Sequence, residues 1–330
     1  MKTLFQRPDQ LDEPLDVIVT VFNSPRFRNR WKLYEDFASR VEGLPSVRLW
    51  TVEVAFGRRA FAVTRPGHPR HLQLRTSAEI WHKERAQNLM LARVVAQYPE
   101  AKYIAFVDAD ISFARHDWAD SARQRLQHYH VVQMWGEAYD LDADGHITQE
   151  HESFTKCYLS GLPFPGPTNY YLPKGGQKIN WHPGYAWAWR REALDAVGGL
   201  IDFAILGSAD FHMAHALVGN LIPTLNRGGA EAFNKNYNRR MRQWQRLAER
   251  GIRRNIGLVK GSIFHHYHGA KKDRQYESRY RILKETEFDP DQDLVRDSQG
   301  LYRLQHYGGR RSDALRDRVR AYFHQRDEDK

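Results

Sequence analysis

Apolar residues in the first 110 positions follow two alternating periods. β-Branched and aromatic residues fill 15–22 (LDVIVTVF) and 47–56 (VRLWTVEVAF), which predicts two buried strands. Helical spacing is present at 30–41 and again at 77–98, which opens with a serine suited to capping. The apolar run at 103–111 (YIAFVDADI) predicts a third strand. This alternation of strand and helix indicates βαβ units, a parallel sheet and an α/β fold.

The second half of the chain has a less regular pattern. Residues 129–141 predict another strand, and 163–176 (PFPGPTNYYLPKGG) are a Pro- and Gly-rich loop long enough to be functional. Residues 184–200 predict a strand running into a helix that closes at Gly198, and 208–220 predict a further helix.

Composition indicates a globular protein. The 330 residues are 41% hydrophobic and 12% aromatic, enough for one large α/β domain with extensions or for two small domains. Without an internal repeat or a clean linker, we expect one domain over 1–284 and a loosely packed extension over 285–330 that ends in a helix. The single cysteine, Cys157, excludes an internal disulfide framework and a multi-cysteine zinc site, which fits a reducing cytoplasm. No segment has the pattern of a signal peptide or a membrane span, so we expect a cytoplasmic protein without membrane contact.

Two aspartates, Asp108 and Asp110, stand at the far end of the apolar run 103–111. Burying two like charges close together is costly unless a cation lies between them. In α/β sheets ligands bind at the carboxyl ends of strands, and an Asp-x-Asp there offers the oxygen ligands that Mg²⁺ and Mn²⁺ prefer. The pattern therefore indicates a metal site, with an ordinary acidic turn as the alternative.

Four segments, in this order, resemble the nucleotide-sugar glycosyltransferases of the GT-A fold, family 2 in particular: VIVTVFNSP, WHKERAQNL, YIAFVDADI and GYAWAWRREALDAVGGLIDFAILGSAD. The resemblance covers residues 15–270. It implies the GT-A fold, with a Rossmann-like, mostly parallel central sheet flanked by helices. It also implies Mn²⁺ or Mg²⁺, a nucleotide-sugar donor (a UDP-sugar as first choice) and single displacement with inversion.

Carried over position by position, the resemblance implies roles for the matching residues. Asp108 and Asp110 become the metal and diphosphate motif, Asp110 being the firmer direct ligand, with His268 as third metal ligand. Asp210 becomes the catalytic base, because a carboxylate near the sugar can take the proton of the attacking hydroxyl. The donor-binding positions are Thr20, Phe22 and Asn23 for the nucleoside; Lys83, Arg85, Asn88 and Lys271 for the diphosphate; and Trp187 for the sugar or acceptor pocket.

These positions also have alternatives. Asp210 would equally serve as the cap of the following helix, and His212 is a rival base beside it. His265 and His266 are rivals to His268 as metal ligand. The basic residues near Lys83 would also suit an exposed helix face, and Lys272 and Arg274 share the charge of the Lys271 segment.

Positive charge is concentrated in one part of the chain. The net charge is +10, and between Arg227 and Lys260 ten Lys or Arg residues face two Glu, an excess of eight. On a helix over 235–255, five arginines fall within about 80° of one another, opposite an apolar face. The apolar face holds Tyr237, Met241, Trp244 and Ala248. We call the basic face the arginine ridge: Arg239, Arg242, Arg246, Arg250 and Arg253.

An arginine ridge of this kind suits a phosphate backbone, because each contact releases counterions. A solvated basic helix face is the simpler explanation. An anionic membrane surface would want an accompanying apolar stripe facing the lipid, which the helix lacks.

Further segments are similar to bacteriophage glycosyltransferases associated with TET-type DNA hydroxylases: LWTVEVAFGRRAF, IWHKERAQNL, FVDADISFARHDW, VVQMW and HHYHGAKKDRQYESRYRIL. That resemblance implies sugar transfer to 5-hydroxymethylcytosine in phage DNA, in the cytoplasm of the bacterial host. One alternative is a GT-A glycosyltransferase with a glycan or protein acceptor. The other is a non-catalytic DNA-binding module on a degenerate transferase fold.

Overall fold

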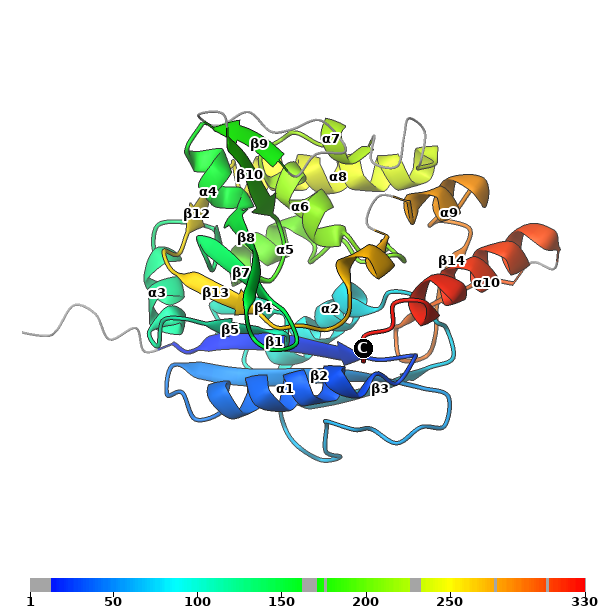
Figure 1. The fold of residues 1–330 in the computed structure, drawn as a ribbon, viewed down its shortest axis with the longest axis horizontal. Helices are drawn as coiled ribbons and strands as arrows, with labels where there is room; N and C mark the ends of the chain where they lie inside the picture. The colour runs from blue at the N-terminus through cyan, green and yellow to red at the C-terminus, as the bar shows by residue number, and fades with distance from the viewer. Residues whose placement is uncertain are drawn as a thin grey trace, which may run out of the picture.

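The described part of the chain forms two large β-sheets and one two-stranded sheet, with helices around them (Figure 1). The structure, a computed structural model, describes residues 13–161, 171–174, 177–225, 233–275, 278–306 and 309–329. The strands of the larger sheet are β1 (Leu15–Phe22), β2 (Val47–Phe56), β3 (His71–Thr76), β4 (Tyr103–Val107), β6 (Val131–Gln133), β11 (Ala186–Arg190) and β12 (Ile256–Leu258). They lie in the order β12-β6-β11-β4-β1-β2-β3.

This larger sheet is mostly parallel, as predicted. The pairs β3–β2, β2–β1, β1–β4 and β6–β12 are parallel, whereas β11 runs antiparallel between β4 and β6. β1 and β2 begin and end where their apolar runs do. Their side chains are buried on both faces, so the run and the strand coincide.

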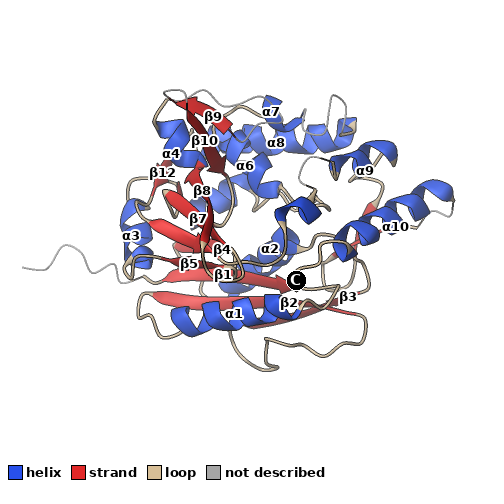
Figure 2. Ribbon diagram, viewed as in Figure 1, coloured by secondary structure: helices blue, strands red, loops and turns tan. Residues whose placement is uncertain are grey.

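Helices cover both faces of this sheet (Figure 2). The helices of the described chain are α1 (Arg28–Val41), α2 (Lys83–Gln97), α3 (Trp118–Arg125), α4 (Phe154–Leu159), α5 (Arg191–Val197), α6 (Ala209–Leu217), α7 (Ile222–Leu225), α8 (Lys235–Gly251), α9 (Tyr280–Glu285), α10 (Arg310–His324) and the 3₁₀ turn η1 (Lys271–Arg274). Tyr34 and Phe37 of α1 pack with one set of core residues, and Met90 and Val94 of α2 pack with the other. The α/β prediction is therefore confirmed.

A second sheet stands against the first. Its strands are β5 (Ile111–Phe113), β7 (Glu137–Leu141), β8 (Ile147–Ser153), β9 (Tyr171–Lys174), β10 (Gln177–His182) and β13 (Ser262–His265). The chain passes from the first sheet to the second three times, between β4 and β5, β6 and β7, and β12 and β13. The single strands predicted at 103–111 and 129–141 are therefore each two short strands. Apolar periodicity continues across the junction and does not reveal which sheet a residue joins.

One helix starts later than predicted. Residues 77–82 do not continue the helix of α2, and 71–76 form the edge strand β3 within a polar stretch. Ile80 and His82 are buried, with His82 Nε2 2.7 Å from the carbonyl oxygen of Ala78. Tertiary burial of these side chains overrides the local helical pattern.

The C-terminal extension ends in a helix, as predicted, but its loose packing was wrongly predicted. It contains the hairpin of β14 (Leu294–Arg296) and β15 (Tyr302–Leu304), followed by α10. Leu315, Val319 and Tyr322 of α10 belong to the same core cluster as the buried face of α2. The apolar side of α10 therefore completes the main core.

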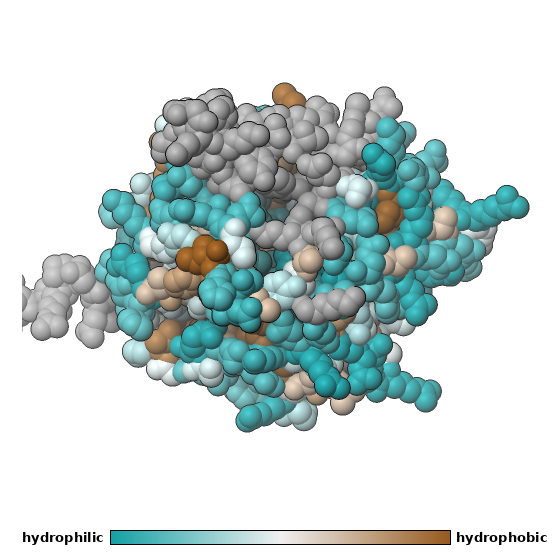
Figure 3. All heavy atoms as spheres, viewed as in Figure 1, coloured by the Kyte–Doolittle hydropathy of each residue, from teal (hydrophilic) through white to brown (hydrophobic). Residues whose placement is uncertain are grey.

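The two faces of α8 are those predicted. Tyr237, Met241, Trp244 and Ala248 are buried, and every member of the arginine ridge is exposed, with Arg253 just beyond the helix end. Within the described residues, no helix combines the length and apolarity needed to cross a membrane. The face in Figure 3 is mainly hydrophilic, with hydrophobic residues in small separate patches.

Candidate active site

A cavity of about 150 Å³ opens where β1 and β4 end and the second sheet begins. Thr20 and Phe22 line it from β1, His182 from the end of β10, and Tyr185 from the turn before β11. Its basic lining residues are Arg30, Lys83, Arg274, Arg279 and Arg326, and its acidic ones are Glu84, Asp108, Asp110 and Asp210. The carboxyl edge of the parallel sheet thus carries the site, as is usual in α/β folds.

Three side chains in this cavity are arranged as metal ligands. One ligand atom each from Asp110, His265 and His268 lies within 4.8 Å of the others. Asp110 Oδ2 is 3.0 Å from His268 Nε2. Among the described residues, the buried Oδ1 of Asp110 has no hydrogen-bond partner, although buried carboxylate oxygens normally find one. A carboxylate with an unpartnered buried oxygen beside two imidazoles fits a divalent cation such as Mn²⁺.

Asp140 orients one of these histidines. It faces His265 across the β7–β13 pair, and its carboxylate accepts hydrogen bonds from His265 Nδ1 at 2.6 Å, from the Tyr185 hydroxyl at 3.2 Å and from His151. Burial alone would raise the pKa of Asp140, but the bonds from the two histidines hold it below its ordinary value. Because an ionised carboxylate only accepts, the proton of His265 stays on Nδ1 and its Nε2 lone pair faces Asp110 and His268.

Tyr185 is held in an unusual backbone conformation beside this group. Its φ is +74°, which is uncommon for a residue with a side chain. Its ring stacks on His182 with centroids 4.2 Å apart, and its hydroxyl bonds to Asp140. Such conformations persist where surrounding contacts determine them, and they are frequent at functional sites.

Asp108 lies outside the group of three potential metal ligands. Its carboxylate forms an ion pair with Lys83, and its backbone N–H donates to the carbonyl of Tyr185 at 2.8 Å. Burial would lower the pKa of Lys83, but the carboxylates of Asp108, Glu84 and Asp210 raise it above its ordinary value. The cation that accompanies Asp108 in this structure is therefore the Lys83 ammonium.

Asp210 lies in the first turn of α6 and faces the cavity. Its Oδ1 accepts the backbone N–H of Phe211 at 2.8 Å. A Cβ atom at Gly184 would lie 2.6 Å from Oδ2, so the glycine makes room for this carboxylate. Glu84 lies on the same side of the cavity, and burial raises its pKa from 4.5 to about 7. Asp210 is thus a carboxylate in a fixed position with one face toward the cavity.

The end of β1 forms another wall. The ring of Phe22 meets that of Trp81 edge-on, with centroids 5.0 Å apart. Within the described part of the chain, the buried hydroxyl of Thr20 has no hydrogen-bond partner. Asn23 instead holds the turn before α1: its amide donates to the Phe27 carbonyl at 2.7 Å and accepts from the Phe27 N–H at 2.9 Å.

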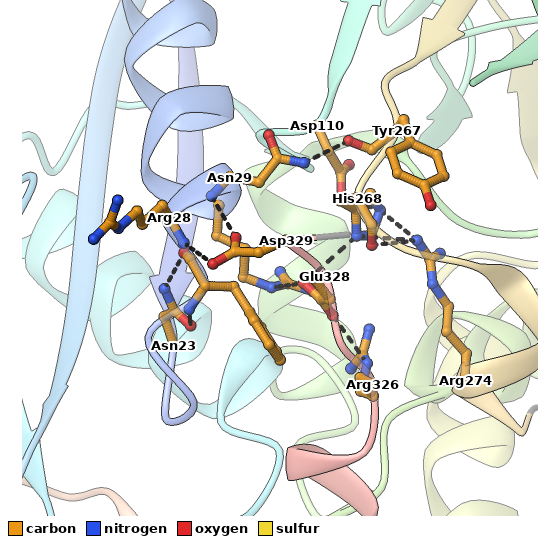
Figure 4. A network of polar contacts seen from close by, with 12 residues as sticks. Asn23, Arg28, Asn29, Asp110, Tyr267, His268, Arg274, Arg326, Glu328 and Asp329 are labelled. Carbon is orange, nitrogen blue, oxygen red and sulfur yellow. Dashed lines mark hydrogen bonds and ion pairs between the residues drawn. The ribbon is translucent and has the colours of Figure 1, made fainter. Parts of the chain in front are cut away.

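Arginines from three distant segments line the cavity, and Figure 4 shows two of them, Arg274 beside His268 and Arg326 beside Glu328. Arg274 contacts His268, with its Nη2 2.8 Å from Nε2. Arg279 is buried and donates to the Tyr322 hydroxyl at 2.8 Å and to Ser208. Arg30 and Arg326 both pair with Glu328. Fixed guanidinium groups around a small cavity suit a phosphate or diphosphate ligand.

Several of the residues singled out in the sequence lie elsewhere. Arg85 and Asn88 of α2 bond to the carbonyls of Gly300 and Leu200, at 2.6 and 2.9 Å, and so anchor neighbouring loops. His212 is fully buried, with Nε2 3.1 Å from the Tyr237 hydroxyl.

Three further residues were singled out in the sequence: His266, Trp187 and Lys271. His266 faces the Ser112 hydroxyl at 3.0 Å. Trp187 is half-buried, donates to the carbonyl of Pro183 at 2.6 Å and lines a smaller apolar pocket that shares Lys83 and Asp210 with the main cavity. The Lys271 side chain lies outside the described residues.

Arg30, Arg279, Arg326, Asp140 and Glu84 were missed as site residues in the sequence analysis. Glu84 adjoins Lys83, and Arg279 follows Arg274 within the same basic segment. Their charge next to predicted site residues was the feature that could have identified them. No local feature of the sequence identifies Asp140 or Arg326, because their roles depend on a strand register and on docking of the segment after α10.

Comparisons with known proteins give limited likenesses. The sequence matches neither a protein-family model nor a curated protein. Among solved structures, the chain is similar to the mannosyltransferase PcManGT from Pyrobaculum calidifontis, in complex with GDP-Man and Mn²⁺, with a TM-score of 0.40, 16% identity, and coverage of 84% of this chain and 64% of that one. It is also similar to S. aureus TarS 1-349 in complex with UDP-GlcNAc, with a TM-score of 0.40, 11% identity, and coverage of 82% and 66%. The chain thus spans less than two thirds of either.

Proposed function

We propose that this protein is a divalent-metal-dependent glycosyltransferase of the GT-A type that uses a nucleotide-sugar donor. The observation that carries the proposal is the group Asp110, His265 and His268, in which Asp110 Oδ1 is buried without a partner among the described residues. This group lies in a cavity ringed by arginines and facing Asp210. The sequence motifs that resemble GT-A enzymes supply these same aspartates and His268.

Each part of the cavity suits one part of a nucleotide sugar. Thr20 and Phe22, at the end of β1, would contact the nucleoside, for which uridine is our choice. The five basic side chains of the cavity would bind the diphosphate: Lys83, Arg30, Arg274, Arg279 and Arg326. A metal held by Asp110, His265 and His268 would supply further positive charge there. Asp108, next to Lys83, would face the donor ribose or diphosphate.

Asp210 would act as general base in a single displacement. Its carboxylate takes the proton of the acceptor hydroxyl while that oxygen forms a bond to the anomeric carbon. The bond between this carbon and the diphosphate oxygen breaks, and the nucleoside diphosphate leaves with the electron pair. The attack comes from the face opposite the leaving group, so the configuration inverts. The arginines hold the departing charge in place, away from bulk water.

We further propose that the acceptor is 5-hydroxymethylcytosine in DNA, as in hypermodified phage DNA. Support comes from the arginine ridge, whose members are all exposed. Asp291 pairs with Arg239, whereas within the described residues no carboxylate forms an ion pair with the other four. Three exposed cations on one helical face, with Arg253 just beyond the helix end, suit a phosphate backbone. The hydroxymethyl group would be reached from the major groove or after base flipping.

The test is direct transfer. The protein, Mn²⁺ and a panel of nucleotide sugars are incubated with hydroxymethylated duplex DNA, and the nucleosides are then weighed by mass spectrometry. We expect a glycosyl mass gain on hydroxymethylcytosine that disappears in Asp210→Asn. Donor turnover without any mass gain on DNA would contradict the proposed DNA acceptor but would agree with a glycosyltransferase that has another acceptor. No turnover of any donor would contradict both.

A further inference from the structure

The segment after α10 reaches the candidate active site from the far end of the chain. Arg326 and Glu328 are buried there, and Asp329 lies beside α1, about 300 positions away in the sequence. Figure 1 shows this end of the chain next to α1, and Figure 4 shows its contacts. Glu328 and Asp329 take no part in the proposed chemistry, yet both contact elements that form the cavity.

Asp329 caps α1. Its carboxylate accepts the backbone N–H groups of Arg28, at 3.0 Å, and Asn29, at 2.9 Å. Phe27, the residue in the N-cap position, has an apolar side chain that cannot accept these hydrogen bonds. The first N–H groups of a helix need acceptors, and a negative charge there also complements the helix dipole. Asp329 therefore performs, from a remote segment, the function of a local Ser or Asp cap.

Glu328 lies behind two arginines of the cavity. Both of its oxygens face Arg30, with Arg30 Nη2 2.8 Å from Oε1, and Arg326 Nε is 3.0 Å from Oε1. Only 1% of Glu328 is exposed, and it is not among the described residues that line the cavity, whereas Arg30 and Arg326 are. Glu328 lines a smaller neighbouring pocket with Arg30 and Arg326. Its carboxylate thus contacts the two guanidinium groups from outside the main cavity.

Glu328 also approaches His268. Its Oε2 is 3.7 Å from His268 Nδ1, while His268 Nε2 faces Asp110. Asp140 lies closer to His265, whose Nδ1 donates to it at 2.6 Å while the cluster is on the Nε2 side. Each imidazole of the cluster therefore has a buried carboxylate on its Nδ1 side, hydrogen-bonded at His265 and at ion-pair distance at His268.

The backbone next to His268 is shaped for this segment. Gly269 has φ +89°, and a Cβ on it would lie 2.8 Å from the Asp327 carbonyl oxygen and 2.9 Å from the Glu328 Cα. A side chain at this position would push the segment away from the cavity. The fit between loop and segment argues for a fixed docked arrangement.

We propose that Glu328 and Asp329 are positioning residues that hold Arg30, Arg326 and His268 in place for a metal-bound diphosphate. The inference rests on the proposed function, because that function supplies the ligand. Asp329 seats the start of α1, which carries Arg30, and Glu328 orients the three side chains. In the opposite arrangement, Glu328 would compete with the ligand for the arginines, and its neutralisation would improve binding. Its place outside the cavity lining favours the positioning role.

The experiment uses inorganic pyrophosphate with Mg²⁺ as probe, titrated calorimetrically into the full chain. Glu328→Gln keeps the shape of the side chain and removes its charge, and we expect the pyrophosphate Kd to rise at least about tenfold, as for other groups that orient ligand-binding side chains. Asp317→Asn is the matched control, because Asp317 is an exposed carboxylate on α10 that pairs with Arg316. We expect it to leave the Kd unchanged. Circular dichroism confirms that each variant is folded at the titration temperature.

A second measurement needs no ligand. Hydrogen exchange of peptides covering 27–33 reports the amides that Asp329 caps, and Asp329→Ala, which removes the accepting oxygens, should accelerate it whereas Asp317→Ala should not. An unchanged or lower pyrophosphate Kd in Glu328→Gln would overturn the role of Glu328, and unaltered exchange in Asp329→Ala would overturn that of Asp329. If the wild type does not bind pyrophosphate, the diphosphate part of the proposed function fails. The exchange measurement then still decides whether Asp329 caps α1.

Discussion

The cavity and the arginine ridge are both rich in arginine, but the side chains have different environments. In the cavity, Arg279 and Arg326 are buried and bonded to Tyr322 and Glu328. On the ridge, every arginine is exposed. Buried paired charges are fixed in direction and little screened by salt, whereas exposed ones are mobile and screened. The cavity is therefore suited to one small anion in one geometry, and the ridge to an extended polyanion.

The largest effect is expected at the metal group. Asp110→Asn removes the carboxylate whose Oδ1 has no partner among the described residues, and we expect Mn²⁺ binding to weaken by about 100-fold or more and transfer to fall below detection. Asp108→Asn is the matched change two residues away, on the carboxylate paired with Lys83, and should retain most Mn²⁺ affinity. Titration of both variants with Mn²⁺ measures the difference. Equal losses would mean that Asp108 is also a ligand.

The next effect separates catalysis from binding within the cavity. A methyl group in Gly184→Ala would lie 2.6 Å from Asp210 Oδ2 and 2.8 Å from His182 Cε1, so it would displace the proposed base together with the neighbouring His182 ring. We expect kcat to fall by about 100-fold, because a misplacement of about 1 Å has that cost, while the pyrophosphate Kd stays constant. Steady-state kinetics and calorimetry measure the two quantities. A loss of binding as large as the loss of rate would count against Asp210 as base.

A third prediction concerns stability and pH. Because burial raises the pKa of Glu84 from 4.5 to about 7, the folded state resists ionising it. The free energy of unfolding of the wild type, minus that of Glu84→Gln, should therefore be highest below pH 4.5. This difference should fall as the pH rises to about 7, by at most roughly 3 kcal/mol. Denaturant unfolding at several pH values measures this difference. Glu35→Gln, at an exposed position of α1, is the control and should show no such trend.

The smallest effect per residue is expected on the ridge. Replacing Arg242 and Arg246 by Gln should weaken binding of hydroxymethylated duplex several-fold and make the plot of log K against log salt shallower by up to about 2. Arg316→Gln, an exposed arginine of α10, should change neither. Fluorescence anisotropy over a range of salt concentrations provides both values. An unchanged slope would leave the ridge as a solvated surface and remove its support for a DNA acceptor.

The sequence predicted most where burial is uniform along an element. β1 and β2 were predicted with their observed bounds, because both faces of each strand are buried. The helix α5 ends at Gly198 as predicted, in the left-handed conformation that glycine adopts readily. The buried and exposed faces of α8 were predicted because helical geometry alone separates them.

Contacts between distant segments could not be predicted in this way. Nothing near His268 in the sequence indicates Glu328, and nothing near Asp140 indicates that strand register places it opposite His265. Asp108 and Asp110 are alike in sequence, but one faces Lys83 and the other the two histidines.

The sequence by itself determined the α/β architecture, the acidic pair at the end of the central strand and the arginine ridge. Each of these follows from local periodicity, which a strand or helix converts directly into a face or an end. Only the tertiary structure decided which aspartate joins His265 and His268, which arginines enclose the cavity, and that the chain end supports them. Those outcomes depend on how two sheets meet and where a remote segment docks, and both are set by packing across the whole chain.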